Sequence, residues 1–242
     1  MENWLLHALL GVLLIMPWQS QKGIRLLDEQ VRHDPAARML FYRSAILGQW
    51  VLATIAVFAL SSRDPAWTAG LVAPVLDGDS VFVLVLGSIA ALSQCPLIPW
   101  VHRRLLESPT ARRSLHALRN ILPRSPDEKR MWVHVALTAG ICEEILFRGF
   151  LIYYAQAVLG LETVGAVAMS SAVFAICHYY QGTMNMIRVG IVGVVFATIM
   201  VVTESLIFCI VLHAILDLGA LRMGDIVAPD DLERPSEDID DI

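Results

Sequence analysis

Several runs of apolar residues approach the length needed to cross a lipid bilayer, and they constrain the fold more than any other feature of the chain. A transmembrane helix needs roughly 20 predominantly apolar residues. Of the 242 residues, 56% are hydrophobic and only 17% are charged, whereas a soluble domain is about a quarter charged. We therefore predict an all-α fold, a polytopic bundle of about seven transmembrane helices. The predicted spans are 4–18, 44–61, 81–101, 131–154, 161–178, 184–203 and 205–221.

The first two segments leave alternatives open. The run at 4–18 has the length of a signal peptide, but no small-x-small cleavage motif follows it, so we interpret it as a short, uncleaved first span. The segment 23–43 is polar and basic, with Ile24, Leu27 and Val31 at helical spacing. This pattern predicts either a short amphipathic helix on the membrane surface or an ordinary solvated helix.

Basic residues are distributed unevenly among the loops. The segments 23–43 and 103–130 are rich in Lys and Arg, whereas 62–80 contains only Arg63. By the positive-inside rule the two basic loops are cytoplasmic, which places the N-terminus outside and the C-terminus in the cytoplasm. We expect an integral protein of a bacterial inner membrane. Basic loops beside spans contact anionic lipid headgroups, so we expect membrane lipid as a partner and no nucleic acid.

The sequence divides into three parts without an internal repeat or a separate soluble domain. Residues 1–130 hold the N-terminal spans and their basic cytoplasmic loops, and residues 131–223 hold the last four spans. The acidic segment 224–242 is predicted to be a disordered, solvated tail.

The fourth predicted span carries ionisable residues, Glu143, Glu144 and Arg148. Such groups cost roughly 2.5–3.5 kcal/mol each in a membrane, so they pair, line a wet cavity or take part in chemistry. Glu144 and Arg148 are four residues apart and share a helix face, which predicts an ion pair. Glu143 points about 100° away, so its carboxylate is free. One held glutamate beside a free one suits a general base.

Two later spans add three more polar residues. His178 ends the fifth span, and His213 and Asp217 lie four apart on one face of the seventh. An isolated histidine near a helix end is more often a structural hydrogen bonder. Polar groups in spans usually face the bundle interior, however, so three helices can present these residues to one cavity.

Two chemistries and a non-catalytic role fit these residues. Glu143 can take a proton from a water that attacks a peptide carbonyl, while His213 and Asp217 stabilise the oxyanion or Asp217 orients His213. Alternatively, Glu143, His178, His213 and Asp217 hold a divalent metal such as zinc, although the chain lacks an H-E-x-x-H motif. The other alternative is a non-enzymatic membrane protein, a transporter or scaffold, that uses the same residues as a structural or ion-conducting network. Spacing alone does not separate a hydrolase from a transporter.

Three motifs follow one another along the later spans: Glu143-Glu144-x-x-x-Arg148, Phe174-x-x-x-His178 and His213-x-x-x-Asp217. Their order resembles that of the CAAX prenyl protease 2 family, also called Abi, the CAAX proteases and bacteriocin-processing enzymes. The resemblance covers roughly 131–221 and implies an intramembrane endopeptidase, of a family often classed as metalloproteases, with its protease core at 131–223. It implies a protein or peptide substrate, and prenylated or membrane-anchored ones fit the family.

The resemblance also implies a role for each motif residue. Glu143 would be the water-activating base and would work with His178 on the water. Glu144 and Arg148 would support and orient Glu143. His213 would belong to the oxyanion site.

Asp217 departs from the family pattern, because many members carry Asn at this position. An ionised carboxylate cannot donate a hydrogen bond to an oxyanion. Asp217 therefore suits a metal ligand, or a partner that orients His213, better than an oxyanion donor.

The predicted boundaries place two of these residues at different depths. If the fourth span begins at Met131, Glu143 lies about 18 Å along its helix, whereas His178 lies near the cytoplasmic end of the fifth span. We expect that the fourth helix begins before the bilayer or that the fifth continues past His178.

Overall fold

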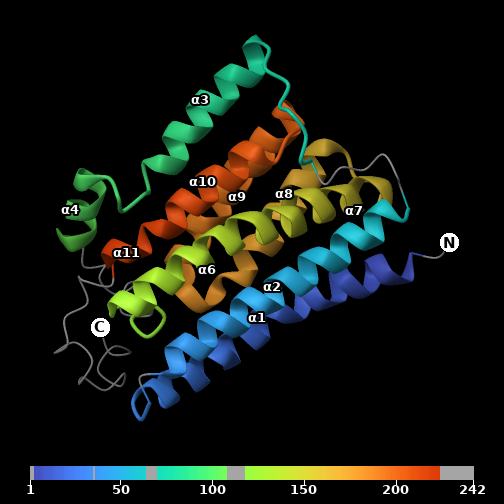
Figure 1. Ribbon diagram of the computed structural model, residues 1–242. Helices are drawn as coiled ribbons and strands as arrows, with labels where there is room; N and C mark the ends of the chain where they lie inside the picture. Colours follow the sequence, from blue (N-terminus) through green and yellow to red (C-terminus); the bar gives the residue numbers. More distant parts are fainter. Residues whose placement is uncertain (1–2, 35, 64–69, 108–117, 224–242) are drawn as a thin grey trace.

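The computed structural model describes residues 3–34, 36–63, 70–107 and 118–223, and every regular element in these ranges is helical (Figure 1). The prediction of an all-α fold is confirmed. The acidic tail lies outside the described residues, as do Arg112 and Arg113 of the third loop. The helices are α1 (Trp4–Val31), α2 (Ala37–Ser61), α3 (Gly78–Leu92), α4 (Pro99–Glu107), α6 (Pro126–Glu144), the π-helix η1 (Ile145–Leu151), α7 (Ile152–Ala157), α8 (Thr163–Cys177), the 3₁₀ turn η2 (Tyr179–Gln181), α9 (Thr183–Thr203), α10 (Ile207–Leu218) and α11 (Ala220–Met223).

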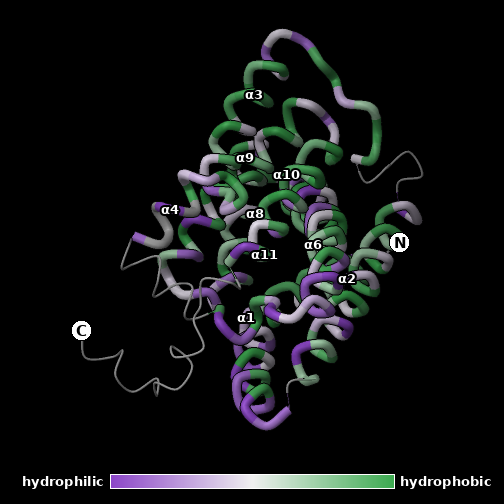
Figure 2. Tube along the Cα trace, turned by 60° about the vertical axis from the view of Figure 1, so that its left-hand side comes forward, coloured by the Kyte–Doolittle hydropathy of each residue, from purple (hydrophilic) through white to green (hydrophobic). Residues whose placement is uncertain are grey.

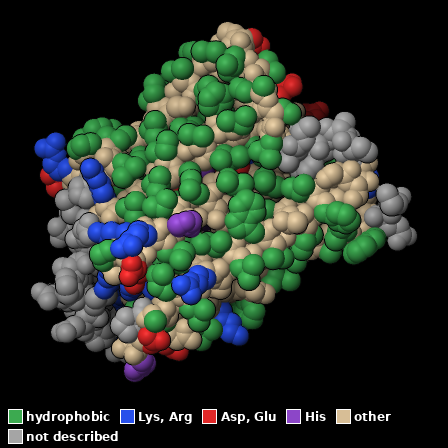
Figure 3. Space-filling model, viewed as in Figure 1, with side chains coloured by type: hydrophobic (Ala, Val, Ile, Leu, Met, Phe, Trp, Pro, Cys, Tyr) green, Lys and Arg blue, Asp and Glu red, His purple; other side chains and the backbone are tan. Residues whose placement is uncertain are grey.

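The exterior of the bundle is apolar. By length and composition α2 and α9 can cross a membrane, and α3 and α8 are shorter apolar helices. Only 22% of the apolar stretch of α2 and 28% of that of α9 is buried, whereas a core helix of a soluble protein is mostly buried. Hydrophobic residues consequently dominate much of the helical trace in Figure 2, and apolar side chains cover much of the face shown in Figure 3. The chain has the exterior of an integral membrane protein, and the number of seven spans stays a prediction.

Charge is concentrated toward one end of the bundle. On the face shown in Figure 3, most Lys and Arg side chains lie toward the end where α1 finishes and α6 begins. This asymmetry agrees with the uneven distribution of Lys and Arg among the loops, from which the orientation of the chain in the membrane was predicted. The orientation itself, with the N-terminus outside, stays a prediction.

The N-terminal helices differ from the predicted boundaries. The structure has one continuous helix, α1, where separate elements were predicted at 4–18 and 23–43, and α2 already begins at Ala37. A change from apolar to polar composition alters what a helix faces but does not end it. Helix α3 stops at Leu92, well before the predicted end at Val101, and Pro96 follows shortly after it.

The start of α6 is fixed by a capping box. The Ser125 hydroxyl accepts from the Glu128 backbone N–H, the Glu128 carboxylate accepts from that of Ser125, and Pro126 is the first helical residue. The helix therefore begins five residues before the predicted start at Met131. The prediction missed this first turn because it is polar. The Arg38 guanidinium donates to the Glu128 carboxylate at 2.7 Å, which ties α2 to this end of α6.

The middle of the bundle is formed by α6, α8, α9 and α10. These helices lie between α1 and α2 on one side and α3 on the other (Figure 1). Helix α6 packs against both α2 and α10, and α8 packs against α9. A Cβ on Gly140 would lie 3.0 Å from the Ile210 carbonyl oxygen and 3.1 Å from the Ala214 Cβ. Glycine at this position therefore lets α10 approach α6 closely. The predicted spans 184–203 and 205–221 are one residue apart, and α9 and α10 are joined there by a short turn in which Glu204 adopts a left-handed conformation with φ 53°.

Candidate active site

Three neighbouring parts of the bundle bring all six predicted site residues together. Glu143 and Glu144 end α6, and Arg148 follows in η1. His178 caps the C-terminus of α8, and α10 supplies His213 and Asp217. A π-helical segment widens the turn directly after the two glutamates, and such segments are frequent at functional sites.

Glu144, Arg148 and His213 form what we call the inner layer. Glu144 and Arg148 are fully buried, and their side chains form an ion pair at 2.9 Å. The same carboxylate oxygen, Glu144 Oε1, lies 2.7 Å from His213 Nδ1, which must carry the hydrogen because an ionised carboxylate only accepts. Glu144 and Arg148 thus carry opposite charges in contact, although Glu144 Oε2 and Arg148 Nε have no hydrogen-bond partner among the described residues.

The Arg148 guanidinium is held from two further directions. It lies over the Phe174 ring at 4.2 Å, and its Nη2 donates to the Gly193 carbonyl oxygen at 3.4 Å. A Cβ on Gly193 would come within 3.4 Å of Arg148 Nη2, so the absence of a side chain keeps that approach open. The arginine thereby links η1 to α8 and α9.

Glu143, His178 and Asp217 form what we call the cavity layer. Glu143 Oε1 accepts a hydrogen bond from Gln49 Nε2 at 2.8 Å, whereas Glu143 Oε2 has no hydrogen-bond partner among the described residues. His178 Nδ1 lies 2.8 Å from the Phe174 carbonyl oxygen and donates to it, so the other ring nitrogen, Nε2, is an acceptor. This Nε2 lies 3.8 Å from Glu143 Oε2.

His213 joins the two layers. Its Nε2 lies 3.9 Å from Glu143 Oε2 and 3.8 Å from Asp217 Oδ2, distances too long for direct hydrogen bonds. The partner that hydrogen-bonds His213 is therefore Glu144 rather than Asp217. Asp217 lies farther out, and its backbone carbonyl accepts from Trp132 Nε1 at 2.9 Å.

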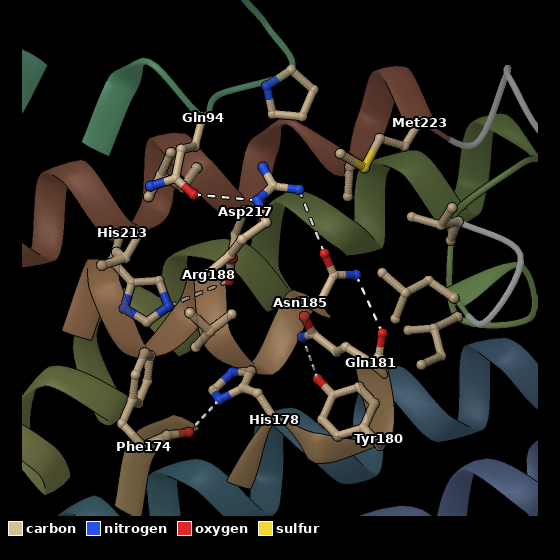
Figure 4. Close-up of a pocket in the computed structure, with 18 of the residues that line it drawn as sticks. Gln94, Phe174, His178, Tyr180, Gln181, Asn185, Arg188, His213, Asp217 and Met223 are labelled. Carbon is tan, nitrogen blue, oxygen red and sulfur yellow. Dashed lines mark hydrogen bonds and ion pairs between the residues drawn. The ribbon is translucent and has the colours of Figure 1, made fainter. Parts of the chain in front are cut away.

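The site lies between two cavities. One, of about 230 Å³, is lined by His178, His213 and Asp217 together with residues of α9 (Figure 4). The other, of about 500 Å³, lies between α1, α2 and α6 and is lined by Glu143 and Gln49. His178 and Asp217 border both cavities, so the residues of the cavity layer can be reached from either side.

The predicted metal-ligand set does not form a recognisable metal site. Within the described ranges, no group of three or more His, Cys, Asp or Glu side chains is placed to hold a metal ion. Glu143 Oε1 is engaged by Gln49, and His213 Nδ1 is engaged by Glu144. Glu143 Oε2 and the Nε2 atoms of His178 and His213 are not engaged in this way, so the metal ion stays a prediction, and the chemistry below is derived from the side chains alone.

Two contributions were missed in the sequence. Gln49 is the carboxamide that holds Glu143, and the available signal was a polar residue inside the apolar stretch 44–61. Phe174 belongs to a recognised motif but received no role. Its ring packs on Arg148 and lies 4.5 Å from the His178 ring, so it positions both.

The predicted difference in depth between Glu143 and His178 does not exist, since the two side chains are adjacent. Helix α6 starts at Pro126, earlier than predicted, and the chain continues past His178 into η2. Of the two expected explanations, the earlier start of the fourth helix is present, whereas α8 itself ends at Cys177 and a separate 3₁₀ turn follows His178.

A comparison with protein families supports the resemblance. The family model described as Rce1-like, type II CAAX prenyl endopeptidase, matches residues 127–219, a segment that contains all six predicted site residues. Comparisons with curated proteins and with solved structures gave no match.

Proposed function

Because residues 127–219 carry an Rce1-like domain, of a protease family, we propose that the chain is an intramembrane endopeptidase that hydrolyses a peptide bond with a water activated by Glu143. One observation carries the proposal. Glu143 Oε2 is buried without a hydrogen-bond partner among the described residues and faces the Nε2 atoms of both His178 and His213, between two cavities. A buried carboxylate oxygen without a partner is costly. Glu144 Oε2 also lacks a partner among the described residues, but Glu143 is the one of the two glutamates that lines a cavity.

The spacing around Glu143 Oε2 suits a bridging water. Its 3.8 Å separation from His178 Nε2 exceeds a hydrogen bond but leaves room for a water that bonds to both. Both atoms accept hydrogen bonds, so the two water hydrogens would point at them and the oxygen lone pairs would be free to attack. Gln49 holds the other oxygen of the carboxylate and fixes its plane.

In the reaction, Glu143 takes one proton from the water while the water oxygen forms a bond to the peptide carbonyl carbon. The carbonyl oxygen gains the negative charge. His213 in its protonated form can donate Nε2–H to this oxyanion, while Glu144 accepts from Nδ1 and holds the ring. Glu143 then returns the proton to the leaving amine nitrogen as the C–N bond breaks, which restores the starting carboxylate.

The two cavities suit a substrate that reaches the site from the membrane. The cavity between α1, α2 and α6 includes apolar side chains such as Met16, Ile24 and Phe41. An apolar or lipid-modified segment of a protein or peptide can lie against such walls. The peptide bond would then cross the cavity layer beside Glu143.

Cleavage by the purified protein tests the proposal. Wild type and Glu143→Gln would be incubated in detergent with mixed peptides, including C-terminally prenylated ones, with and without a strong chelator. We expect wild-type cleavage, and a loss of at least about 100-fold in Glu143→Gln, because a general base contributes 10²–10⁴-fold. Unchanged cleavage by Glu143→Gln would contradict the proposal. A chelator effect on wild type would restore the metal alternative.

A further inference from the structure

Arg188 lies in the second turn of α9 and borders the cavity of about 230 Å³ that also contains His178, His213 and Asp217 (Figure 4). It is partly buried, and the mechanism above does not use it. Arginine in a membrane protein is costly unless it is paired or faces water, so its presence in this cavity needs an explanation.

Arg188 differs from the fully buried arginines in its partners. Arg38, Arg119 and Arg148 each contact a carboxylate, at 2.7, 3.7 and 2.9 Å. Within the described part of the chain, no carboxylate lies within 4 Å of Arg188. Its two hydrogen bonds are long and go to neutral carboxamides: Nε to Gln94 Oε1 at 3.4 Å, and Nη1 to Asn185 Oδ1 at 3.5 Å. The guanidinium therefore keeps donors available for an anion.

The groups beside Arg188 at the start of α9 are polar but uncharged. Asn185 Nδ2 donates to the Gln181 carbonyl oxygen, and Gln181 Nε2 donates to the Tyr180 hydroxyl (Figure 4). Helix α9 begins at Thr183 without a side-chain cap. Because Gln181 and Asn185 line the cavity, the positive end of the α9 dipole lies at the same edge of the cavity. An anion beside Arg188 would meet a cation and amide groups rather than another negative charge.

We propose that Arg188 binds a carboxylate of the peptide substrate; this inference rests on the proposed function. A guanidinium matches the planar carboxylate with two parallel hydrogen bonds. Asp217 borders the same cavity and repels a carboxylate, so the pair of charges sets the direction of the peptide: its anionic end lies at Arg188 and its scissile bond lies nearer Glu143. The carboxylate can be the C-terminus of the peptide or an acidic side chain near the cut.

The test compares matched peptides that differ only in charge. One peptide carries a free C-terminal carboxylate, the second a C-terminal amide, and the third an amide plus one acidic side chain near the cut. Cleavage of each would be measured with wild type, Arg188→Gln and Arg188→Lys. Arg222→Gln is the matched control, since Arg222 is exposed and donates to the Leu97 carbonyl oxygen without bordering the cavity.

We expect wild type and Arg222→Gln to cleave one of the two anionic peptides about 10- to 100-fold better than the neutral amide, through KM, as charge-assisted hydrogen bonds allow. Arg188→Gln should lose this preference while it still cleaves the neutral amide, and Arg188→Lys should keep part of it. The preferred anionic peptide identifies the source of the carboxylate. Binding of the three peptides to Glu143→Gln provides the same comparison without turnover.

The outcomes separate this inference from the proposed function. Glu143-dependent cleavage with equal rates for all three peptides would overturn the role of Arg188 and would leave the proposed endopeptidase function standing. A preference that persists in Arg188→Gln would overturn it as well. Absence of both cleavage and binding for every peptide would overturn both proposals, and melting temperatures of the variants exclude loss of fold as the cause.

Discussion

Glu143 and Glu144 are neighbours in the chain but lie in opposite environments. Glu144 is fully buried, and one of its oxygens is shared between Arg148 and His213. Each glutamate keeps one oxygen without a hydrogen-bond partner among the described residues, but that of Glu143 lies near two histidine nitrogens, and Glu143 lines a cavity. Successive residues of a helix point about 100° apart, so α6 can direct one carboxylate inward and the next toward the cavity.

This difference distinguishes Glu144, whose charge holds helices together, from Glu143, whose charge is placed to react. The inner layer holds α6, η1 and α10 together through the Glu144–Arg148 ion pair and the His213–Glu144 hydrogen bond, whereas the cavity layer lines the cavities, where its side chains can meet water or substrate. Changes in the inner layer should therefore lower stability and activity together. Changes in the cavity layer should lower activity alone.

The largest effect on stability is expected from Arg148→Met. This change removes one half of a fully buried ion pair and leaves the Glu144 carboxylate unpaired. Such losses cost about 3–5 kcal/mol. The free energy of unfolding in detergent would be measured beside that of the double variant Glu144→Gln/Arg148→Met, which should recover a large part of the loss. A single variant as stable as wild type would show that the pair does not hold the fold.

A smaller loss of stability is expected from Gly140→Val, because the added side chain must push α10 away from α6. Overpacking of this kind costs about 1–3 kcal/mol. Cleavage should fall as well, since His213 moves with α10. Gly11→Val is the control, because a Cβ on Gly11 meets nothing within 4 Å. Equal melting temperatures for the two variants would contradict the proposed close approach.

Another paired carboxylate, that of Glu128, lies at the start of α6 and makes the free energy of unfolding depend on pH. Burial opposes ionisation of Glu128, but the backbone N–H groups of Ser125 and Arg124 and the Arg38 guanidinium together hold its pKa below the ordinary value. The carboxylate therefore adds stability above its unfolded pKa, and this stability is lost as the pH falls through the folded pKa.

Glu128→Gln should lower the free energy of unfolding by about 2 kcal/mol at neutral pH, as expected for hydrogen bonds to a charged group, and flatten its decline in acid. Unfolding would be followed between pH 7 and pH 3. Asp127→Asn is the control, because the Asp127–Arg130 pair is exposed and exposed pairs contribute about 0–1 kcal/mol. An identical pH dependence in wild type and Glu128→Gln would refute this assignment.

The smallest effect is expected from Gln49→Leu, which keeps a similar size but removes the hydrogen bond to Glu143 Oε1. We expect cleavage to fall about 10-fold, since one hydrogen bond to a charged group contributes about 1.5–3 kcal/mol, with little change in melting temperature. Gln19→Leu is the control on the wall of the same cavity. If both variants cleave equally well, Gln49 does not position the base.

The sequence predicts which polar residues lie together better than it predicts the boundaries of the helices. The cost of placing Glu143, Arg148 and His213 in apolar runs singles them out, and helical spacing by itself predicts the Glu144–Arg148 pair, which the structure confirms. Hydropathy responds to composition, so it divided the continuous α1 and missed the polar first turn of α6, which Ser125 and Glu128 cap.

Contacts between distant helices could not be predicted from spacing within one helix. The hydrogen bond of His213 to Glu144 depends on how closely α10 approaches α6, and that of Gln49 to Glu143 on the position of α2. Arg188 is one arginine among many in the sequence. Its place in the cavity, with no carboxylate of the described residues within 4 Å, distinguishes it.

The most direct test measures two quantities, kcat/KM for a cleaved peptide and the melting temperature, for wild type, Glu143→Gln and Glu144→Gln. If Glu143 is the catalytic base, Glu143→Gln should lose at least about 100-fold in kcat/KM and keep the wild-type melting temperature. Glu144→Gln should lose both, because Arg148 is left without its counter-charge. Cleavage by Glu143→Gln at the wild-type rate, or Glu144→Gln indistinguishable from Glu143→Gln in both quantities, would contradict the separation of the two glutamates.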